Sequence, residues 1–324
     1  MSGRTQLELF REHFDQIKIE AACLCGRRDG IRIGRADRYG INITPFFCTA
    51  CGHVYSKYRL DETHLAQFYA ESYRSLYTNG EGLKTFEAAD SRIKASSRTI
   101  LPALQALRED WQRCVVVEWG CGAGWNLVPF RENNIECYGF DFDKEYIEYG
   151  RVQFGLDLRT IDTATDPALI LHKKADFFVL NHVLEHVTDP LALLDRVAQL
   201  LRRDALVYVG LPFLEKLPTW GFKDYFHISH LHYFSIPYFV TLARGSGWTN
   251  VTISKKHGYV VLRRDPVVEM RPRYRAYNGY IIVKFAFLYL VLYRVWRLFV
   301  GIAKKCPGVE PSYVRLMKRF GRMV

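Results

Sequence analysis

The stretch Cys114-Val115-Val116-Val117-Glu118-Trp119-Gly120-Cys121-Gly122-Ala123-Gly124 decides the fold of this chain. It is an apolar, β-branched run that ends in a glycine-rich turn, and helical periodicity can begin at Trp125. The pattern therefore predicts a buried strand, a tight loop and the start of a helix. Glycine lets a backbone pass close to a bound ligand, and the helix that follows directs free N–H groups toward it. A purely structural turn is the alternative interpretation.

The glycines of this loop recur at every second residue, as Glu118-x-Gly120-x-Gly122-x-Gly124, with an acid just before the first. The phosphate-binding pattern GxGxxG has a different spacing and lacks the leading acid. A loop with a carboxylate suits a ligand that carries positive charge better than it suits a pyrophosphate. The next predicted strand ends at Asp141, 21 residues after Gly120, where a carboxylate can hydrogen-bond a ribose diol.

This spacing resembles motif I of the class I S-adenosylmethionine-dependent methyltransferases, whose cofactor carries an ammonium group and a sulfonium. The resemblance implies that Glu118 and the glycines at 120, 122 and 124 hold the methionine moiety and that Asp141 holds the ribose. It implies an α/β fold with a Rossmann-like, seven-stranded methyltransferase sheet. Strands and helices alternate along the chain after the loop, as expected for a parallel sheet with helices on both faces.

Other residues are expected at the carboxyl ends of the later strands, where ligands bind in such sheets. Asp162 and Thr163 follow the third strand and are expected at the adenine edge. Asn181 and His182 follow the fourth strand, 175–180, and are expected near the cofactor.

Local signals predict two helix starts and the far edge of the sheet. We expect Asp143 to cap a helix over 144–154, and Thr188-Asp189-Pro190 to begin another, with proline in its favoured first turn. The segments 248–254 and 259–263 are expected to pair antiparallel and to close the sheet.

Two close cysteine pairs precede the glycine loop. They are Cys23-x-Cys25 and Cys48-x-x-Cys51, each followed by glycine. This arrangement predicts a structural zinc site of the zinc-ribbon type, with no open position for a substrate. The first pair is tighter than the usual C-x-x-C, so His53 is a possible replacement ligand, and four reduced, unligated thiols are the alternative.

A cysteine ribbon ahead of motif I narrows the resemblance to the zinc-containing sugar C-methyltransferases of deoxysugar pathways and related bacterial glycan-cluster enzymes. Matching segments are Tyr73-Arg74-Ser75, Asn181 to Val187 and the loop 227–235. The resemblance implies that His230 is the catalytic base and that Tyr73 faces the active site from a lid. His227 and Ser229 replace a tyrosine and a glutamate of the family, which favours transfer to a hydroxyl, since that reaction needs one base and alignment.

The loop 227–235 contains three histidines, His227, His230 and His232. They permit a metal-binding strand, but no carboxylate or cysteine lies nearby in the sequence. A titrating base in the pocket is therefore the favoured interpretation, with His230 and His227 as candidates.

The net charge of +11 comes entirely from the C-terminus, because residues 263–324 hold 14 Lys and Arg against 3 Asp and Glu. A run of nine apolar residues, 285–293, is flanked there by Lys284 and Arg294. It is too short to span a bilayer, so we expect residues 276–324 to form a basic amphipathic helical tail on an anionic membrane surface. Docking on the protein itself or on a dimer partner is the alternative, and nucleic acid is disfavoured.

The sequence thus predicts four parts: an N-terminal helix and zinc-ribbon-like module (1–64), a helical lid or linker (65–108), a methyltransferase core (109–262) and the basic extension (263–324). The predicted activity is methylation of a sugar or glycan, including a lipid-linked one, on oxygen or carbon. A quinone-like or other small hydroxylated acceptor and a non-catalytic, zinc-bearing membrane adaptor are the alternatives. The start of the chain has no signal-peptide run, so we expect a cytoplasmic protein, peripheral at the inner face of the membrane if the tail binds there.

Overall fold

The structure is a computed structural model that describes residues 6–69, 89–161, 171, 173–217 and 225–265. The predictions made for Tyr73, for Asp162 and for the tail 276–324 fall outside these residues. Within the described ranges, no helix combines the length and the apolar character needed to cross a membrane.

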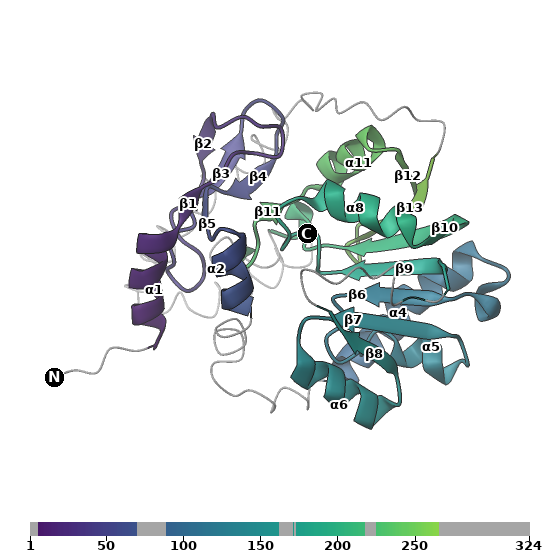
Figure 1. Cartoon of the computed structure of the whole chain (residues 1–324). Coiled ribbons are helices and arrows are strands. Elements are labelled where there is room, and N and C mark those ends of the chain that lie inside the picture. Colours follow the sequence, from purple (N-terminus) through teal and green to yellow (C-terminus); the bar gives the residue numbers. More distant parts are fainter. Residues whose placement is uncertain (1–5, 70–88, 162–170, 172, 218–224, 266–324) are drawn as a thin grey trace, which may run out of the picture.

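The centre of the molecule is a seven-stranded sheet, as the sequence predicts (Figure 1). Its strands are β6 (Val116–Trp119), β7 (Cys137–Asp141), β8 (Asp157–Thr160), β9 (Ala175–Asn181), β10 (Leu201–Gly210), β12 (Trp248–Ser254) and β13 (Tyr259–Arg264). They lie in the order β12-β13-β10-β9-β6-β7-β8. The pairings from β10 to β8 are parallel, and β13 is antiparallel to both β10 and β12. The predicted antiparallel pair at the edge of the sheet is confirmed.

Helices cover both faces of this sheet. They are α4 (Ala89–Leu107), α5 (Val128–Glu132), α6 (Lys144–Phe154), α8 (Pro190–Gln199) and α11 (Ile236–Gly245). On one face, Leu104 of α4 belongs to the same buried cluster as Phe177 of β9. On the other, Leu194 of α8 and Phe239 of α11 cluster with Phe178, the next residue of that strand. Successive side chains of β9 are therefore buried on opposite faces, as in a parallel sheet covered on both sides.

The two predicted helix starts are confirmed by their caps. The Asp143 side chain accepts a hydrogen bond from the Tyr146 N–H at the start of α6. The Asp189 side chain accepts from the N–H groups of Leu191 and Ala192, and Pro190 occupies the first turn of α8. Both caps satisfy N–H groups that have no partner inside the helix.

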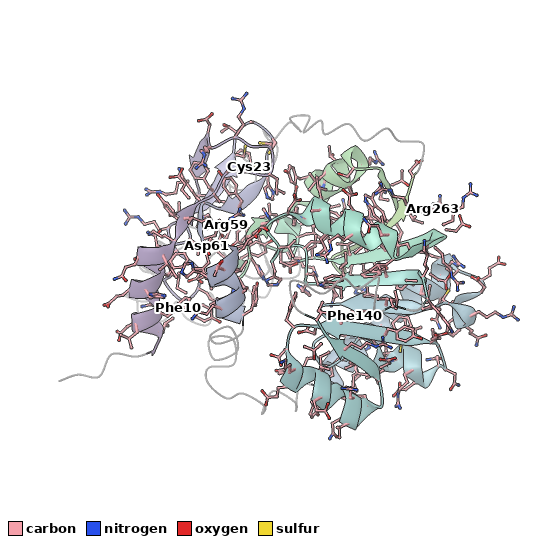
Figure 2. The ribbon with its side chains drawn as sticks, viewed as in Figure 1. Phe10, Cys23, Arg59, Asp61, Phe140 and Arg263 are labelled. Atoms are coloured by element: carbon pink, nitrogen blue, oxygen red, sulfur yellow. The ribbon has the colours of Figure 1, made fainter. Side chains whose placement is uncertain are left out.

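An N-terminal unit lies beside the end of the sheet (Figure 1). Its elements are α1 (Gln6–Ile17), β1 (Ile19–Glu20), β2 (Gly30–Arg32), β3 (Pro45–Cys48), β4 (Val54–Ser56), β5 (Tyr58–Arg59) and α2 (Glu62–Gln67). Figure 2 labels Phe10 of α1 and Cys23 near opposite ends of this unit. Of the helical segment predicted from residue 65 to 107, α2 and α4 are described and the residues between them are not.

The N-terminal unit includes a piece of the later chain. Strand β11 (His232–Tyr233), from the connection between β10 and α11, completes the four-stranded sheet β11-β4-β3-β2. Its His232 lies opposite Tyr55 in an antiparallel pair. Phe226 and Leu231 of the same connection are buried in the apolar core of this unit. The loop with the three histidines therefore belongs to both parts of the molecule.

Candidate active site

The glycine loop follows β6 at the carboxyl end of the sheet. Gly120, Gly122 and Gly124 have φ values of 73°, 54° and 74°, in the left-handed region that side chains disfavour. A Cβ at Gly120 would lie 2.7 Å from Cγ2 of Val183, and one at Gly124 would lie 2.7 Å from Cδ1 of Leu156. Both the backbone conformation and the close packing thus require glycine. The contact with Val183 also places the turn after β9 directly against the loop.

Glu118 is the buried acid at the end of β6, with 0% of its surface exposed. Its Oε1 accepts a hydrogen bond of 2.6 Å from Nδ2 of Asn126, whereas Oε2 has no hydrogen-bond partner among the described residues. Burial, with a smaller contribution from the nearby Asp141, raises the pKa of this carboxyl to about 8. A buried carboxylate with an unused oxygen suits a cationic group, because ionic pairing offsets the cost of burial. The site therefore fits the ammonium group of S-adenosylmethionine.

Asp141 ends β7 and faces the glycine loop. Its Oδ2 accepts from the Gly122 N–H at 2.8 Å, and its Oδ1 accepts from the Asp143 N–H at 2.9 Å. Each carboxylate oxygen can accept more than one hydrogen bond, so these contacts fix the group and leave acceptor capacity for a diol. This geometry is compatible with the predicted ribose contact.

The turn after β9 brings three further residues to the site. The Asn181 side chain lies over Gly210 of the neighbouring strand, where a Cβ would come within 2.1 Å of its Oδ1. His182 has a φ of 57°, and its N–H donates to the Gly210 carbonyl at 2.9 Å. Its ring remains 52% exposed, with Nδ1 at 3.1 Å from Oε1 of Glu185. Asn181 and His182 thus lie at the edge where the sequence places them.

Histidine side chains from two segments meet beside this turn. The rings of His186 and His230 are 4.9 Å apart in an edge-to-face arrangement. Burial, with smaller effects from His186 and His227, lowers the pKa of His230 well below its usual 6.5. The imidazole is therefore neutral at neutral pH, which is the form that accepts a proton.

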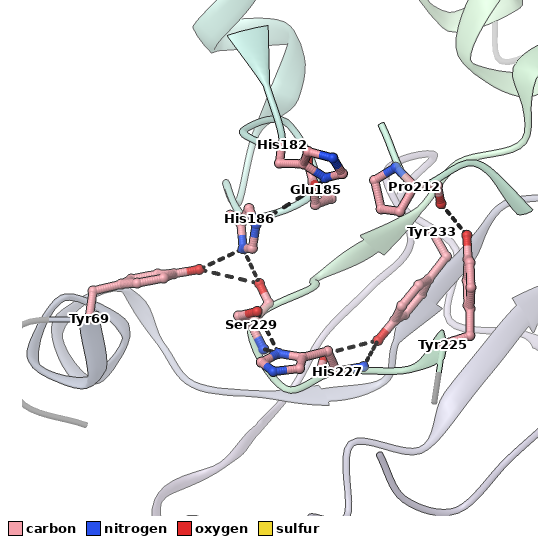
Figure 3. A network of polar contacts seen from close by, with 9 residues as sticks. All are labelled: Tyr69, His182, Glu185, His186, Pro212, Tyr225, His227, Ser229 and Tyr233. Atoms are coloured by element: carbon pink, nitrogen blue, oxygen red, sulfur yellow. Dashed lines mark hydrogen bonds and ion pairs between the residues drawn. The ribbon is translucent and has the colours of Figure 1, made fainter. Parts of the chain in front are cut away.

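His227, the second predicted catalytic histidine, lies inside its own loop (Figure 3). Only 1% of its surface is exposed, and its Nδ1 accepts from the Ser229 N–H at 3.1 Å. Its main-chain groups contact the Tyr233 hydroxyl, and its ring packs edge-on to Tyr39 at 5.2 Å. These contacts fix the conformation of the loop around His227, and its catalytic role stays a prediction.

The four cysteines of the N-terminal unit gather at one point, with their sulfur atoms all within 4.8 Å of one another. The closest pairs are Cys23 and Cys51 at 3.4 Å, and Cys25 and Cys48 at 3.6 Å. Tetrahedral zinc with bonds of about 2.3 Å would set its sulfur ligands about 3.8 Å apart. The Cys51 contact and burial raise the pKa of the Cys23 thiol. The cluster thus suits a zinc ion, whose charge would hold the thiolates together.

His53, which the sequence offers as a replacement zinc ligand, lies elsewhere. Within the described residues the four cysteines form the cluster without it. Its Nε2 instead lies 3.0 Å from Nδ1 of His232, and its ring stacks on Tyr238 at 4.5 Å. His53 therefore connects the cysteine module to β11 and to α11.

Three residues of the site were not singled out from the sequence, namely Glu185, His186 and Tyr69. Glu185 is fully buried, and Nδ1 of His186 lies 2.9 Å from the Tyr69 hydroxyl (Figure 3). The available signal was the matching segment Asn181 to Val187, which contains both Glu185 and His186.

A family profile described as a methyltransferase domain matches residues 88–253. A search of curated proteins gave no significant match. Among solved structures, the chain is similar to magnesium protoporphyrin IX methyltransferase from Synechocystis, at 17% identity and a TM-score of 0.43, covering 62% of this chain and 98% of that one. It is also similar to 1,6-didemethyltoxoflavin N1-methyltransferase from Burkholderia thailandensis, at 18% identity and a TM-score of 0.46, covering 66% and 96%.

Proposed function

Since the chain belongs to the methyltransferase domain family and is an S-adenosylmethionine-dependent methyltransferase, we propose that it methylates a hydroxyl group of a sugar or glycan. The cofactor supplies an electrophilic methyl group on a sulfonium. In this proposal Glu118 and the glycine loop bind the methionine moiety and Asp141 binds the ribose. The acceptor lies on the side of the loop 227–235.

The observation that carries the proposal is the position of His230. Its ring contacts His186, three residues after Val183, which in turn touches Gly120 of the glycine loop. His230 therefore packs on the turn that contacts the glycine loop, and in this proposal its neutral imidazole takes the proton of an acceptor hydroxyl. The likeness of this loop to that of zinc-containing sugar methyltransferases supports a sugar as the acceptor. His227 and Ser229 replace the residues that support carbanion chemistry in those enzymes, which favours oxygen over carbon.

The proposal is tested by transfer of a labelled methyl group to a panel of acceptors. We expect label in nucleotide sugars or in a cell-wall or lipid-linked glycan extract, and we expect His230→Gln to reduce the rate by roughly 10²- to 10⁴-fold, the usual effect of losing a general base. Label only in quinol or phenolic acceptors would replace the sugar assignment by the small hydroxylated acceptor. Labelling of carbon would contradict the hydroxyl assignment.

The ribose contact gives a separate prediction. Asp141→Asn is expected to weaken S-adenosylhomocysteine binding roughly 10- to 100-fold, because hydrogen bonds to a charged acceptor contribute about 1.5–3 kcal/mol. Isothermal titration measures this directly. Asp157→Asn is the matched control, since that carboxylate is exposed on β8 and forms an ion pair with Arg159. Equal affinity of Asp141→Asn and wild type would remove Asp141 from the cofactor site.

A further inference from the structure

Glu185, His186 and His230 each offer one atom that can bind a metal ion, and these three atoms lie within 4.8 Å of one another. We propose that these side chains bind a divalent transition-metal ion beside the cofactor loop, and that the ion holds and activates the acceptor hydroxyl. The metal site stands on the geometry alone. The role in activating the acceptor rests on the proposed function.

The orientation of the His186 ring suits a metal ligand. Its Nδ1 lies 2.9 Å from the carbonyl oxygen of Ser229, a distance that requires the proton on Nδ1, since a carbonyl oxygen only accepts. The neutral ring then has its lone pair on Nε2. That nitrogen lies 3.8 Å from Oε1 of Glu185. A ring nitrogen with a lone pair and a carboxyl oxygen are both groups that ligate transition-metal cations.

This arrangement is also the usual one for a metal-bound histidine, whose second nitrogen donates to a carbonyl or a carboxylate. The Tyr69 hydroxyl donates to the same Ser229 carbonyl at 3.3 Å and lies 2.9 Å from Nδ1 (Figure 3). Tyr69 and Ser229 therefore hold the ring in the orientation that a ligand requires.

Two unsatisfied atoms give a further argument. Glu185 is 0% exposed, and while its Oε1 has His182 as a partner at 3.1 Å, its Oε2 has no hydrogen-bond partner among the described residues. Nδ1 of His230 is also buried without a hydrogen-bond partner among the residues that the structure describes. A buried polar atom without a partner is costly, so such atoms point to a missing ligand or ion. A cation bound by these side chains would be such an ion.

The backbone fixes the two segments relative to each other. The Leu231 N–H donates to the Glu185 carbonyl at 2.7 Å, next to both proposed imidazole ligands. Ser56 of β4 donates from its Oγ to the His230 carbonyl at 2.9 Å. The two segments that carry the ligands are thus joined by main-chain and side-chain hydrogen bonds.

The ligand set indicates which ions fit. Two imidazoles with one carboxylate suit Zn²⁺, Mn²⁺ or Fe²⁺ better than Mg²⁺ or Ca²⁺, which prefer oxygen ligands. Three protein ligands leave at least one position open, unlike the four-cysteine cluster. An acceptor hydroxyl can occupy that position, and the positive charge makes its proton more acidic.

The transfer then balances as follows. The acceptor O–H bond breaks and its proton passes to solvent. In the metal-bound site His230 is a ligand, and the ion takes over the activation of the hydroxyl that His230 would otherwise provide as a general base. The oxygen forms a bond to the methyl carbon while the carbon–sulfur bond breaks, and its electron pair stays on sulfur. The products are the methyl ether and S-adenosylhomocysteine.

The test counts metal and measures transfer on the full-length protein. After equilibration with Zn²⁺, we expect two zinc ions per wild-type chain, and one per chain in Glu185→Gln and in His230→Gln. His257→Gln is the matched control, because His257 is exposed on the turn between β12 and β13 and should keep both ions. Circular dichroism and S-adenosylhomocysteine binding show that each variant is folded.

A mild chelator should remove the second ion reversibly and lower the rate of transfer by about 100-fold, with less than a threefold change in S-adenosylhomocysteine affinity. One zinc ion per wild-type chain, or the same zinc content in wild type and both variants, would overturn the metal site. A second ion whose removal leaves transfer unchanged would overturn its role in activating the acceptor. Absence of transfer to any sugar in every metal state would contradict the proposed function, while the zinc count would still decide the site.

Discussion

Cys48→Ser is expected to abolish zinc binding at the cysteine cluster and to reduce methyl transfer by more than about 100-fold. A structural zinc ion in a small module contributes roughly 10–16 kcal/mol of apparent binding free energy, which is also folding free energy. Cys48 is fully buried at the end of β3, and β3 pairs with β4, which in turn pairs with β11. Loss of the ion should therefore displace the loop that carries His230. Zinc content, thermal denaturation and transfer rate measure these effects.

The glycine loop lies in the other sheet, so Cys48→Ser should keep S-adenosylhomocysteine affinity within about threefold of wild type. Cys114→Ser is the matched control, because Cys114 is a buried thiol in the cluster beside α4 and lies apart from the four cysteines. It should retain zinc and activity. A wild-type protein that contains no zinc, or a fully active Cys48→Ser variant, would contradict the structural role of the cluster.

Glu118→Gln is expected to stabilise the unliganded protein at alkaline pH and to weaken cofactor binding. The folded-state pKa of Glu118, about 8, lies above the ordinary value of 4.5, so the folded chain holds a proton that the unfolded chain releases. The stability of wild type should therefore fall as pH rises from 4.5 to about 8. Glutamine does not titrate, so the variant should lack this loss of stability, which is of the order of 5 kcal/mol above pH 8. Urea unfolding across this pH range measures it.

Cofactor binding should also depend on the titration of Glu118, but the affinity should rise with pH, whereas the stability falls. An ammonium group beside Glu118 favours the carboxylate, so binding of S-adenosylhomocysteine at pH 7 should release close to one proton. The affinity of wild type should rise about tenfold per pH unit up to about pH 8, and that of Glu118→Gln should be lower and nearly constant. Titration in buffers of different ionisation enthalpy detects the proton. Glu148→Gln, at an exposed position on α6, is the control. Equal proton release by wild type and by Glu118→Gln would show that Glu118 is not the source of the proton.

Much of the fold was predictable because its signals are local. The apolar run before Gly120 predicts a buried strand, and the glycines predict the turn that follows. Asp143 and Asp189 each predict the helix that starts at the next residue. The four cysteines were also predictable as a group, because short spacings place each pair in one turn. The tight spacing at Cys23 makes His53 a candidate ligand in the sequence, but the loop between β3 and β4 directs that ring to His232 instead.

The arrangement of Glu185, His230 and Tyr69 was not predictable from local signals. Judged by sequence neighbours alone, His230 has no carboxylate nearby. In the fold, Glu185 reaches it because the turn after β9 and the strand β11 are joined through the Leu231 N–H. That contact depends on β11 pairing with β4, an arrangement between segments about 180 residues apart that no local pattern encodes. Tyr69 enters the site for the same reason.

The central claim is that the acid-led glycine loop and Asp141 together bind the cofactor, with its sulfur facing the histidine loop. A crystal structure of the complex with S-adenosylhomocysteine tests it most directly. We predict the amino group beside Glu118, the ribose hydroxyls on Asp141 and the sulfur toward His230. A ligand bound elsewhere, or a complex in which Glu118 and Asp141 contact no part of it, would contradict the account.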